Sequence, residues 1–186
     1  MSGSIVDYLL DLLEKKCSDI QYGNEDVTQL EHALQCAELA EQHNKSDSFI
    51  TAALLHYIGH LLYEDYDPIH DGKDGVHEDL GANYLEKYFG VEVTLPIRAH
   101  VASKRYLAAV EDGYYDDLSE ASKKSLKVQG GIFSKKEAEG FINKPQMKEA
   151  VEMRRFDDQA KILNKETPNV EHFRKYVENS FQVKSN

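Results

Sequence analysis

The segment AALLHYIGHLLYE, residues 52–64, places His56 and His60 four residues apart in an otherwise largely apolar stretch. In an α-helix this spacing puts both imidazoles on one face. A buried imidazole needs a partner, because an unsatisfied polar group costs free energy in apolar surroundings. Metal coordination is one economical way to supply that partner. The segment therefore predicts a buried helix with two histidines that do chemistry.

Other polar residues with helical spacing could meet these two histidines. Each spaced pair can direct two polar groups into one pocket, although a hydrogen-bonded core histidine is the alternative for any single one. Three histidines stand in polar contexts and are expected to be exposed. The residues of interest are His32, His77, His100 with Lys104, and Arg154 with Asp157, and the histidines expected to be exposed are His43, His70 and His172.

The elements that must position these side chains are helices. Apolar residues recur at helical spacing along nearly the whole chain, and no run alternates clearly with a period of two. Thr28 and Glu31 form a capping box at one helix start, and Ser46 or Asp47 caps the next helix. The predicted helices cover 4–17, 28–43, 47–62, 77–89, 92–110, 118–128, 134–142, 145–163 and 169–181. We expect an all-α protein with one domain over residues 1–186.

One long loop and three positions with glycine or proline separate these helices. The acidic, glycine-containing segment 63–75 is long enough for a lid or a binding role. Gly90, the pair 130–131 and Pro168 mark the ends of other helices.

Composition excludes several classes of function. The chain has 186 residues with 22 basic and 33 acidic side chains, a formal net charge of −11. Such a charge repels nucleic acid and anionic membranes, so we expect neither as a partner. The start of the sequence lacks a signal-peptide pattern, and no stretch approaches a membrane span. Cys17 and Cys36 have no metal-type spacing, and we interpret both as core thiols in a reducing cytoplasm.

The order of His32, His56 and an aspartate near 157 resembles the HD metal-binding superfamily. The members of that superfamily are all-helical bundles that hold one or two metal ions. Their signature is His-Asp, whose aspartate bridges the two ions. Here the segment ALLHYIGH matches the family's ALLHDIGH except at Tyr57.

Several segments narrow the resemblance to one group within the superfamily. They are similar to the small HD-domain mixed-valence di-iron oxygenases that break the carbon–phosphorus bond of 1-hydroxy-2-aminoethylphosphonates. The likeness covers nearly the whole chain. The segments are QLEHALQCA (29–37), LLHYIGHL (54–61), AHVASKRYL (99–107), YYDDLSEASKKSLKVQGG (114–131) and RRFDDQAK (154–161).

The resemblance implies a role for each matching position. Two iron ions in the Fe(II)/Fe(III) state would be cofactors, with residue 57 as their bridge. The matching tyrosine of the family can occupy an iron position at rest, and its acidic partner meets the amino end of the substrate. The metal ligands would be His32, His56 and Asp157 for one iron and His77 and His100 for the other, the catalytic side chains Tyr22, Glu25 and Lys104, and the phosphonate-binding side chains His60, Lys104, Ser122 and Arg154.

The resemblance also implies the reaction. Dioxygen would be the co-substrate, and oxygenation of the hydroxyl-bearing carbon would release phosphate together with glycine or glycine betaine. A primary ammonium on the substrate could donate hydrogen bonds to Glu25, whereas a trimethylammonium group would prefer aromatic faces. Tyr22, Tyr63 or Tyr66 could supply those faces, so both substrates stay open. The oligomeric state is not predicted.

Tyr57 departs from the family at its bridging position. A carboxylate has two oxygens that can span two cations, whereas a phenol has one oxygen on a bulky ring. Tyr57 is thus either an engineered or accidental replacement in an otherwise active member, or a natural feature of a metal-poor relative that binds ligand without turnover, or part of a one-metal site with different chemistry. Retention of the other matching positions favours the first interpretation.

Two other functions compete with the oxygenase. An HD phosphohydrolase would use the same His32, His56 and Asp157 to cleave a phosphate ester with metal-bound hydroxide. A non-catalytic module would use the basic cluster only to bind a phosphorylated ligand. Tyr22, Glu25 and the segment SEASKK favour the oxygenase.

Overall fold

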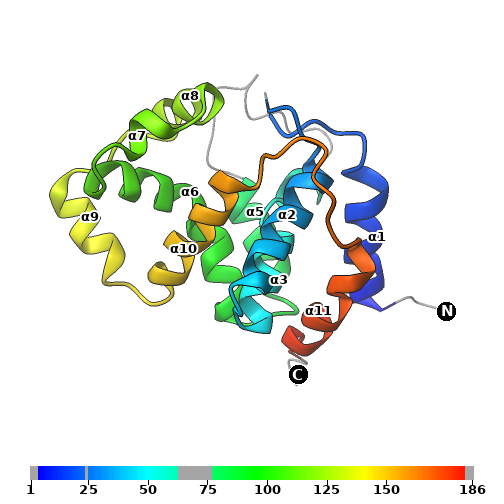
Figure 1. Cartoon of the computed structure of the whole chain (residues 1–186). Helices are drawn as coiled ribbons and strands as arrows, with labels where there is room; N and C mark the ends of the chain where they lie inside the picture. Colours follow the sequence, from blue (N-terminus) through cyan, green and yellow to red (C-terminus); the bar gives the residue numbers. More distant parts are fainter. Residues whose placement is uncertain (1–3, 24, 63–76, 183–186) are drawn as a thin grey trace.

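The computed structural model describes residues 4–23, 25–62 and 77–182, and these residues form an all-α fold (Figure 1). The predicted fold class is confirmed. The predicted loop 63–75 lies outside the described residues, as do Tyr63, Tyr66 and His70. The elements are α1 Ile5–Lys16, α2 Gln29–Gln42, α3 Asp47–Leu55, α4 Gly59–Leu62, α5 His77–Leu85, α6 Val91–Val110, α7 Tyr114–Asp117, α8 Glu120–Val128, α9 Lys135–Ile142, α10 Met147–Gln159, the 3₁₀ turn η1 Val170–Phe173 and α11 Arg174–Ser180.

Capping side chains set the starts of the helices that carry the site. Thr28 accepts a hydrogen bond from the Glu31 backbone while the Glu31 side chain returns to the Thr28 backbone, which confirms the predicted capping box of α2. Ser46, rather than Asp47, caps α3 through the backbone amide of Phe49. These caps satisfy donors that a helix leaves without intrahelical partners.

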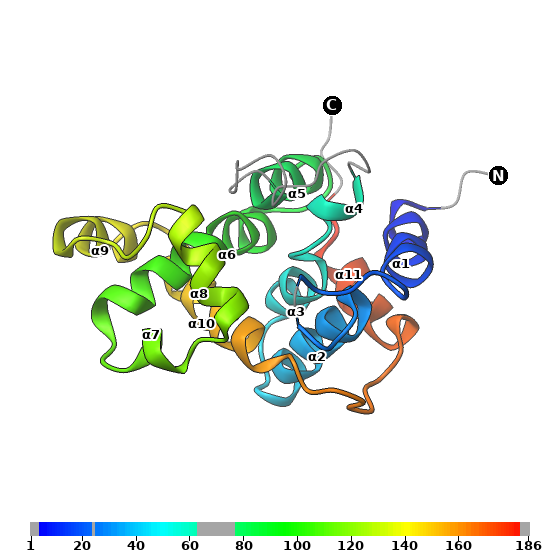
Figure 2. The same ribbon diagram turned by 90° about the horizontal axis from the view of Figure 1, so that it is seen from above.

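The helices α2, α3, α6 and α10 form the centre of the molecule. α10 packs against α6, α2 and α3, and α3 packs against α2 and α6. α1 and α11 lie on one side of this centre, and α7, α8 and α9 lie on the other (Figures 1 and 2). The main hydrophobic core includes Leu9, Leu54, Ile97, Phe156 and Phe173, each at most 4% exposed. A smaller apolar cluster around Phe141 and Met147 packs α9 near α6 and α10.

The prediction of one continuous helix over 47–62 is wrong. α3 ends at Leu55, and the chain then tightens, because Ile58 and His60 donate backbone hydrogen bonds only three residues back, at 3.0 and 3.1 Å. Three residues per turn place position 60 above position 57 rather than above position 56. His56 caps α3, and His60 stacks on Tyr57 instead of sharing a helix face with His56.

Gly59 lets α5 approach this tight turn closely. A β-carbon at Gly59 would lie 1.9 Å from the backbone carbonyl oxygen of His77 and 3.0 Å from the amide nitrogen of Gly81. Neither contact is possible for a larger residue without moving the backbone. The glycine of HYIGH thus brings His77 beside His60 and Tyr57.

Other predicted helices differ mainly at their ends. The predicted helix 118–128 begins at Glu120, with Ser119 as its cap, and α10 is shorter than 145–163 at both ends. The C-terminal helix begins as a 3₁₀ turn. Within the described part of the chain, no helix combines the length and apolar character that crossing a bilayer requires.

Candidate metal and substrate site

His32 and His56 face each other in the centre of the fold. The Nδ1 atom of His32 lies 2.8 Å from the carbonyl of Ala160, and that of His56 lies 2.7 Å from the carbonyl of Ala53. A carbonyl only accepts, so each Nδ1 carries the hydrogen, and each Nε2 of the neutral ring is an acceptor. The two Nε2 atoms are nevertheless only 3.2 Å apart. Two acceptors at this distance need a cation or a proton between them.

Asp157 adds a third acceptor to this pair. Its Oδ1 lies 3.2 Å from His32 Nε2 and 4.0 Å from His56 Nε2, and it accepts a hydrogen bond from the Tyr22 hydroxyl at 2.9 Å. Its Oδ2 accepts from Arg154 at 2.6 Å. Burial by itself raises the pKa of Asp157, but its partners, Arg154 foremost, outweigh burial and hold this pKa well below its usual range. The fully buried carboxylate is therefore ionised.

The protonation of the other groups agrees with a site for a cation. Burial lowers the pKa of His56 to about 3, with Asp157 only partly opposing it. Burial likewise raises the pKa of Tyr22 well above its ordinary value. At neutral pH the imidazole is thus neutral and the phenol protonated, which leaves Asp157 as the anion among these groups.

A single metal ion fits the three acceptors. Bonds of about 2.0–2.1 Å at tetrahedral to octahedral angles separate two donor atoms by roughly 2.9–3.4 Å. The distances of 3.2 Å from His32 Nε2 to His56 Nε2 and to Asp157 Oδ1 fall in this range, while the 4.0 Å between His56 Nε2 and Asp157 Oδ1 is wider. The hydrogen bonds from each Nδ1 to a backbone carbonyl are the kind of contact that orients metal-binding imidazoles.

His77 and His100 form a second pair beside the first. The ring centroids of His56 and His100 are 5.3 Å apart, and those of His77 and His100 are 5.4 Å apart. His100 Nδ1 lies 2.6 Å from the carbonyl of Ile97, which leaves its Nε2 as an acceptor. The Nε2 atom of His77, a residue only 4% exposed, has no hydrogen-bond partner among the described residues. Burial lowers the pKa of both histidines, to about 4 for His100.

The Tyr57 ring lies among five histidines, namely His32, His56, His60, His77 and His100. Its half-buried ring stacks on His60 and meets Tyr22 edge-on. An ion held by His77 and His100 would have to share this space with the phenol ring. The centroid distances from Tyr57 are 4.7 Å to His60, 4.8 Å to Tyr22, 5.1 Å to His56, 5.3 Å to His77, 5.7 Å to His32 and 6.2 Å to His100.

Buried cations lie beside the histidines. Lys104 is 3% exposed and donates to Ser125 Oγ at 2.6 Å, and Ser125 in turn donates to the Ser122 carbonyl. Arg154 is 4% exposed and uses its two terminal nitrogens on Asp157 and Asp158. Both positive charges lower the pKa of His100 further, which indicates that they act on the same centre.

The helix α8 links the acidic residue Glu25 to these cations. Ser119 donates to Glu25 at 2.6 Å, and Lys161 Nζ bridges Glu25 at 2.9 Å and Ser122 Oγ at 3.1 Å. Burial raises the pKa of Glu25, but the hydrogen bonds from Ser119 and Lys161 outweigh it and lower this pKa. Glu25 is therefore an ionised carboxylate that already has a cationic partner.

Among the described residues, the structure brings together the metal-binding, catalytic and phosphonate-binding residues that the sequence singled out, whereas Tyr63 and Tyr66 lie outside the described part of the chain. His43 and His172 are exposed, as predicted. The sequence interpretation missed several neighbours, although their spacing held a signal: Ser119 and Ser125 lie three residues on either side of Ser122, and Lys161 ends the segment RRFDDQAK. Cys36 follows His32 by one helical turn, and Asp158 and Tyr114 extend the Arg154 network through a hydrogen bond between them.

Comparison with known proteins agrees with this arrangement. Residues 30–129 match the model of the HD domain, a range that includes the four histidines of the two pairs but ends before Asp157. The chain is 39% identical over 177 residues, 95% of its length and 90% of the relative, to a [1-hydroxy-2-(trimethylamino)ethyl]phosphonate dioxygenase (glycine-betaine-forming) of Leisingera caerulea. It is 42% identical over 161 residues, 86% of its length and 80% of the relative, to a hydroxymethylphosphonate dioxygenase of Gimesia maris.

A third relative, an uncharacterized protein of Acanthamoeba polyphaga mimivirus, is 37% identical over 82% of the chain and 71% of the relative. The HD match and the dioxygenase relatives imply metal binding, in agreement with the buried histidine and aspartate donors. The chain belongs to the HD-domain family and, within it, to the family of hydroxyphosphonate dioxygenases.

Proposed function

We propose that this protein breaks the carbon–phosphorus bond of a 1-hydroxyphosphonate in an oxygen-dependent reaction. The products would be phosphate and a carboxylate, namely glycine from the 2-amino substrate or glycine betaine from the trimethylammonio substrate. One observation carries the proposal: a buried set of histidine and aspartate donors adjoins buried lysine and arginine side chains. Oxygen chemistry at a metal needs the first group, and an anionic phosphonate needs the second.

The proposed cofactors are two iron ions, one held by His32, His56 and Asp157 and the other by His77 and His100. When bound, the irons would activate dioxygen and coordinate the oxygens of the substrate. Imidazole and carboxylate donors suit iron, as well as manganese and zinc. Tyr22 donates its hydroxyl hydrogen to Asp157 Oδ1, one of the atoms that would face the ion, and the second lone pair of this oxygen stays available to the metal.

Phosphonate binding is assigned to Lys104, Ser122, His60 and Arg154. Lys104 supplies a buried positive charge and Ser122 a hydroxyl on the neighbouring helix. The terminal nitrogens of Arg154 hold Asp157 and Asp158, while its buried Nε has no hydrogen-bond partner among the described residues. Arg154 would therefore meet a phosphonate oxygen through Nε and hold Asp157 ionised at the same time.

Tyr57 decides how far the chain performs this reaction. A phenol ring at the bridging position competes for space with the second ion. We therefore expect the protein with Tyr57 to bind one metal ion and to release phosphate more slowly than its Tyr57→Asp form. The test loads both proteins with iron(II) without air and measures bound iron and phosphate release, with and without dioxygen. Two irons per chain and oxygen-dependent phosphate release by Tyr57→Asp are the expected result.

The alternatives give different outcomes in the same assay. Phosphate release that continues without dioxygen would point to a metal-dependent phosphohydrolase. Phosphonate binding without metal and without turnover, in both forms, would point to a binding module. Either outcome overturns the oxygenase.

Hydroxymethylphosphonate is a second candidate substrate, and the ion pair of Glu25 with Lys161 favours it. The carboxylate assigned to the amino end already has a cation at 2.9 Å, with side chains only 17% and 14% exposed. A substrate ammonium would have to displace Lys161 or share Glu25 with it, whereas a substrate without an amino group needs neither. Relative kcat/KM for the three hydroxyphosphonates, measured on Tyr57→Asp, decides between them.

A further inference from the structure

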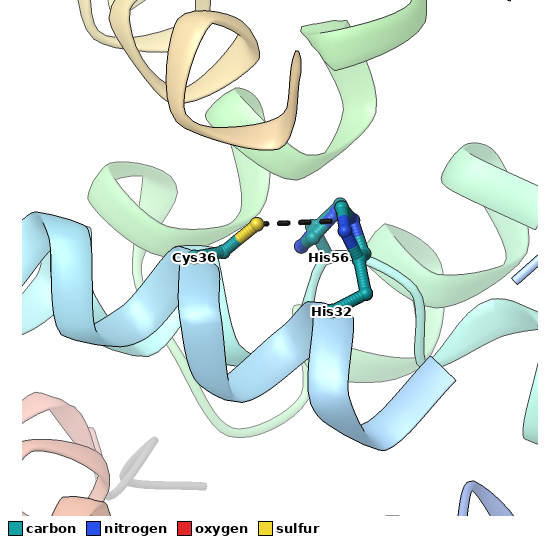
Figure 3. Close-up of side chains that lie close together, drawn as sticks. All are labelled: His32, Cys36 and His56. Atoms are coloured by element: carbon teal, nitrogen blue, oxygen red, sulfur yellow. Dashed lines mark hydrogen bonds between the residues drawn. The ribbon is translucent and has the colours of Figure 1, made fainter. Parts of the chain in front are cut away.

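Cys36 directs its thiol at the pair of facing imidazoles. It lies on α2 one turn after His32, is 1% exposed, and has its Sγ 3.7 Å from His32 Nε2 (Figure 3). The Sγ atom and the ligand nitrogens of His32 and His56 all lie within 4.8 Å of one another. In Figure 3 the three side chains converge on one point between α2 and the end of α3.

Two of the distances around this point match a tetrahedral metal site. Bonds of about 2.3 Å to sulfur and 2.0–2.1 Å to nitrogen separate S from N by roughly 3.5 Å and N from N by roughly 3.4 Å at a tetrahedral angle. The observed separations are 3.7 Å for Cys36 Sγ to His32 Nε2 and 3.2 Å for His32 Nε2 to His56 Nε2. Asp157 Oδ1 lies 3.2 Å from His32 Nε2 and 4.0 Å from His56 Nε2, wider than a tetrahedral edge, and supplies the fourth donor.

Charge gives a second reason for a thiolate at this place. Imidazoles bind a metal in their neutral form, so a dication held by His32, His56 and Asp157 keeps an uncompensated positive charge in a fully buried site. A bound metal can remove the thiol proton from cysteine, and the resulting thiolate balances the charge.

We propose that Cys36 is a direct ligand of the metal ion held by His32, His56 and Asp157. On binding, the Cys36 S–H bond breaks, its proton leaves to the buffer, and the sulfur electron pair forms the bond to a divalent ion such as zinc, cobalt or iron(II). The proposal rests on the proposed function only in placing a metal at these residues.

Cobalt(II) is the probe for this ligand, because a thiolate bound to cobalt gives a charge-transfer absorption in the near ultraviolet. Metal-free full-length protein is titrated with cobalt(II) without air. We expect one cobalt per chain, the charge-transfer band, and release of a proton. Cys36→Ser is expected to bind cobalt without the band and more than about 100-fold more weakly, beyond the typical loss of an outer-shell partner.

Cys17→Ser is the matched control. Cys17 is also 1% exposed, but its Sγ lies near Gln29, away from the histidines. This variant should keep both the band and the affinity, and circular dichroism checks the helical content of both variants. Cobalt binding without the band in the unchanged protein, or loss of the band in Cys17→Ser, overturns the proposal.

These outcomes separate the ligand from the function. Cobalt binding without the band rejects Cys36 as a ligand and leaves the oxygenase proposal in place. The band together with no phosphate release by Tyr57→Asp rejects the oxygenase and leaves the ligand. A protein that binds no cobalt at all overturns the ligand proposal.

Discussion

The two histidine pairs of the site are built differently. In the His32–His56 pair, each imidazole donates Nδ1–H to a backbone carbonyl, and Asp157 is held by both Tyr22 and Arg154. In the second pair, His100 has such a carbonyl partner, but His77 Nδ1 has no carbonyl partner among the described residues and lies 3.1 Å from the Glu78 carboxylate, and the Tyr57 ring lies beside His77. The first pair is organised for a metal by the fold itself, whereas the second depends on what stands at position 57.

The largest expected effect is at the organised pair. Asp157→Asn removes the one carboxylate among the donors and leaves Arg154 without its fully buried partner, so the free energy of unfolding should fall by about 3 kcal/mol. Metal affinity should fall by more than about 100-fold, beyond the loss of an outer-shell partner. Urea unfolding of metal-free protein and equilibrium dialysis measure these two quantities. Asp158→Asn, which keeps the Asp157 contact, is the control and should change metal affinity little.

Removing His77 tests the dependence on residue 57 directly. With Tyr57 present, His77→Ala should leave the bound metal near one ion per chain, because the phenol ring already excludes the second ion. In the Tyr57→Asp background the same change should lower it from two ions to one. Metal analysis of the four proteins measures this, and His56→Ala should lose the first ion in both backgrounds. A drop caused by His77→Ala in the Tyr57 protein would contradict the comparison.

The pH dependence of stability should reflect the organised pair in metal-free protein. Burial lowers the pKa of His56 to about 3, so His56 takes up a proton near pH 6.5 in the unfolded chain but stays neutral at that pH in the folded chain. The contribution of this pKa difference to the free energy of unfolding is fully present above pH 6.5 and declines as the pH falls toward 3. Between pH 7 and pH 5 it should amount to about 2 kcal/mol for this one group.

The check compares unfolding free energies at the two pH values in chelator-treated protein. The change on going from pH 7 to pH 5 should be about 2 kcal/mol smaller in His56→Gln than in the unchanged chain. His172→Gln, at an exposed position, should behave like the unchanged chain. Equal pH dependence of all three proteins would contradict the expected burial of a neutral imidazole.

The smallest expected effect concerns the ion pair of Glu25 with Lys161. Lys161→Met frees Glu25 from its cation while keeping much of the side-chain volume. The preference of Tyr57→Asp for an amino substrate over hydroxymethylphosphonate should rise about threefold to tenfold, as expected for one partly buried ion pair. Ratios of kcat/KM measure it. Lys165→Met removes a lysine that pairs with Glu38 instead and should leave the ratio unchanged.

Much of the fold and the site could be predicted from the sequence alone. The helical periodicity and the capping residues Thr28 and Ser46 are local properties, so the all-α class and most helices followed from them. The type and order of His32, His56 and Asp157 indicated a metal site, and the matching segments indicated the family. The histidines can be recognised in the sequence because a buried imidazole in an apolar helix costs free energy unless it has a partner.

Only the tertiary structure decided the rest. The close packing of Gly59 against α5, in the turn that follows the end of α3 at Leu55, is a contact that a one-dimensional pattern cannot show. From the sequence we interpreted Cys36 as a core thiol, because free cysteine is common in apolar cores. Only the folded structure shows that its Sγ lies close to His32 Nε2. Likewise Lys161 and Glu25 are 136 residues apart in sequence, and only folding brings these opposite charges together. The sequence determined which metal-binding and phosphonate-binding side chains the chain has. The packing of the helices decided which of these donor atoms lie close enough to bind one ion, because coordination depends on separations of a few ångströms.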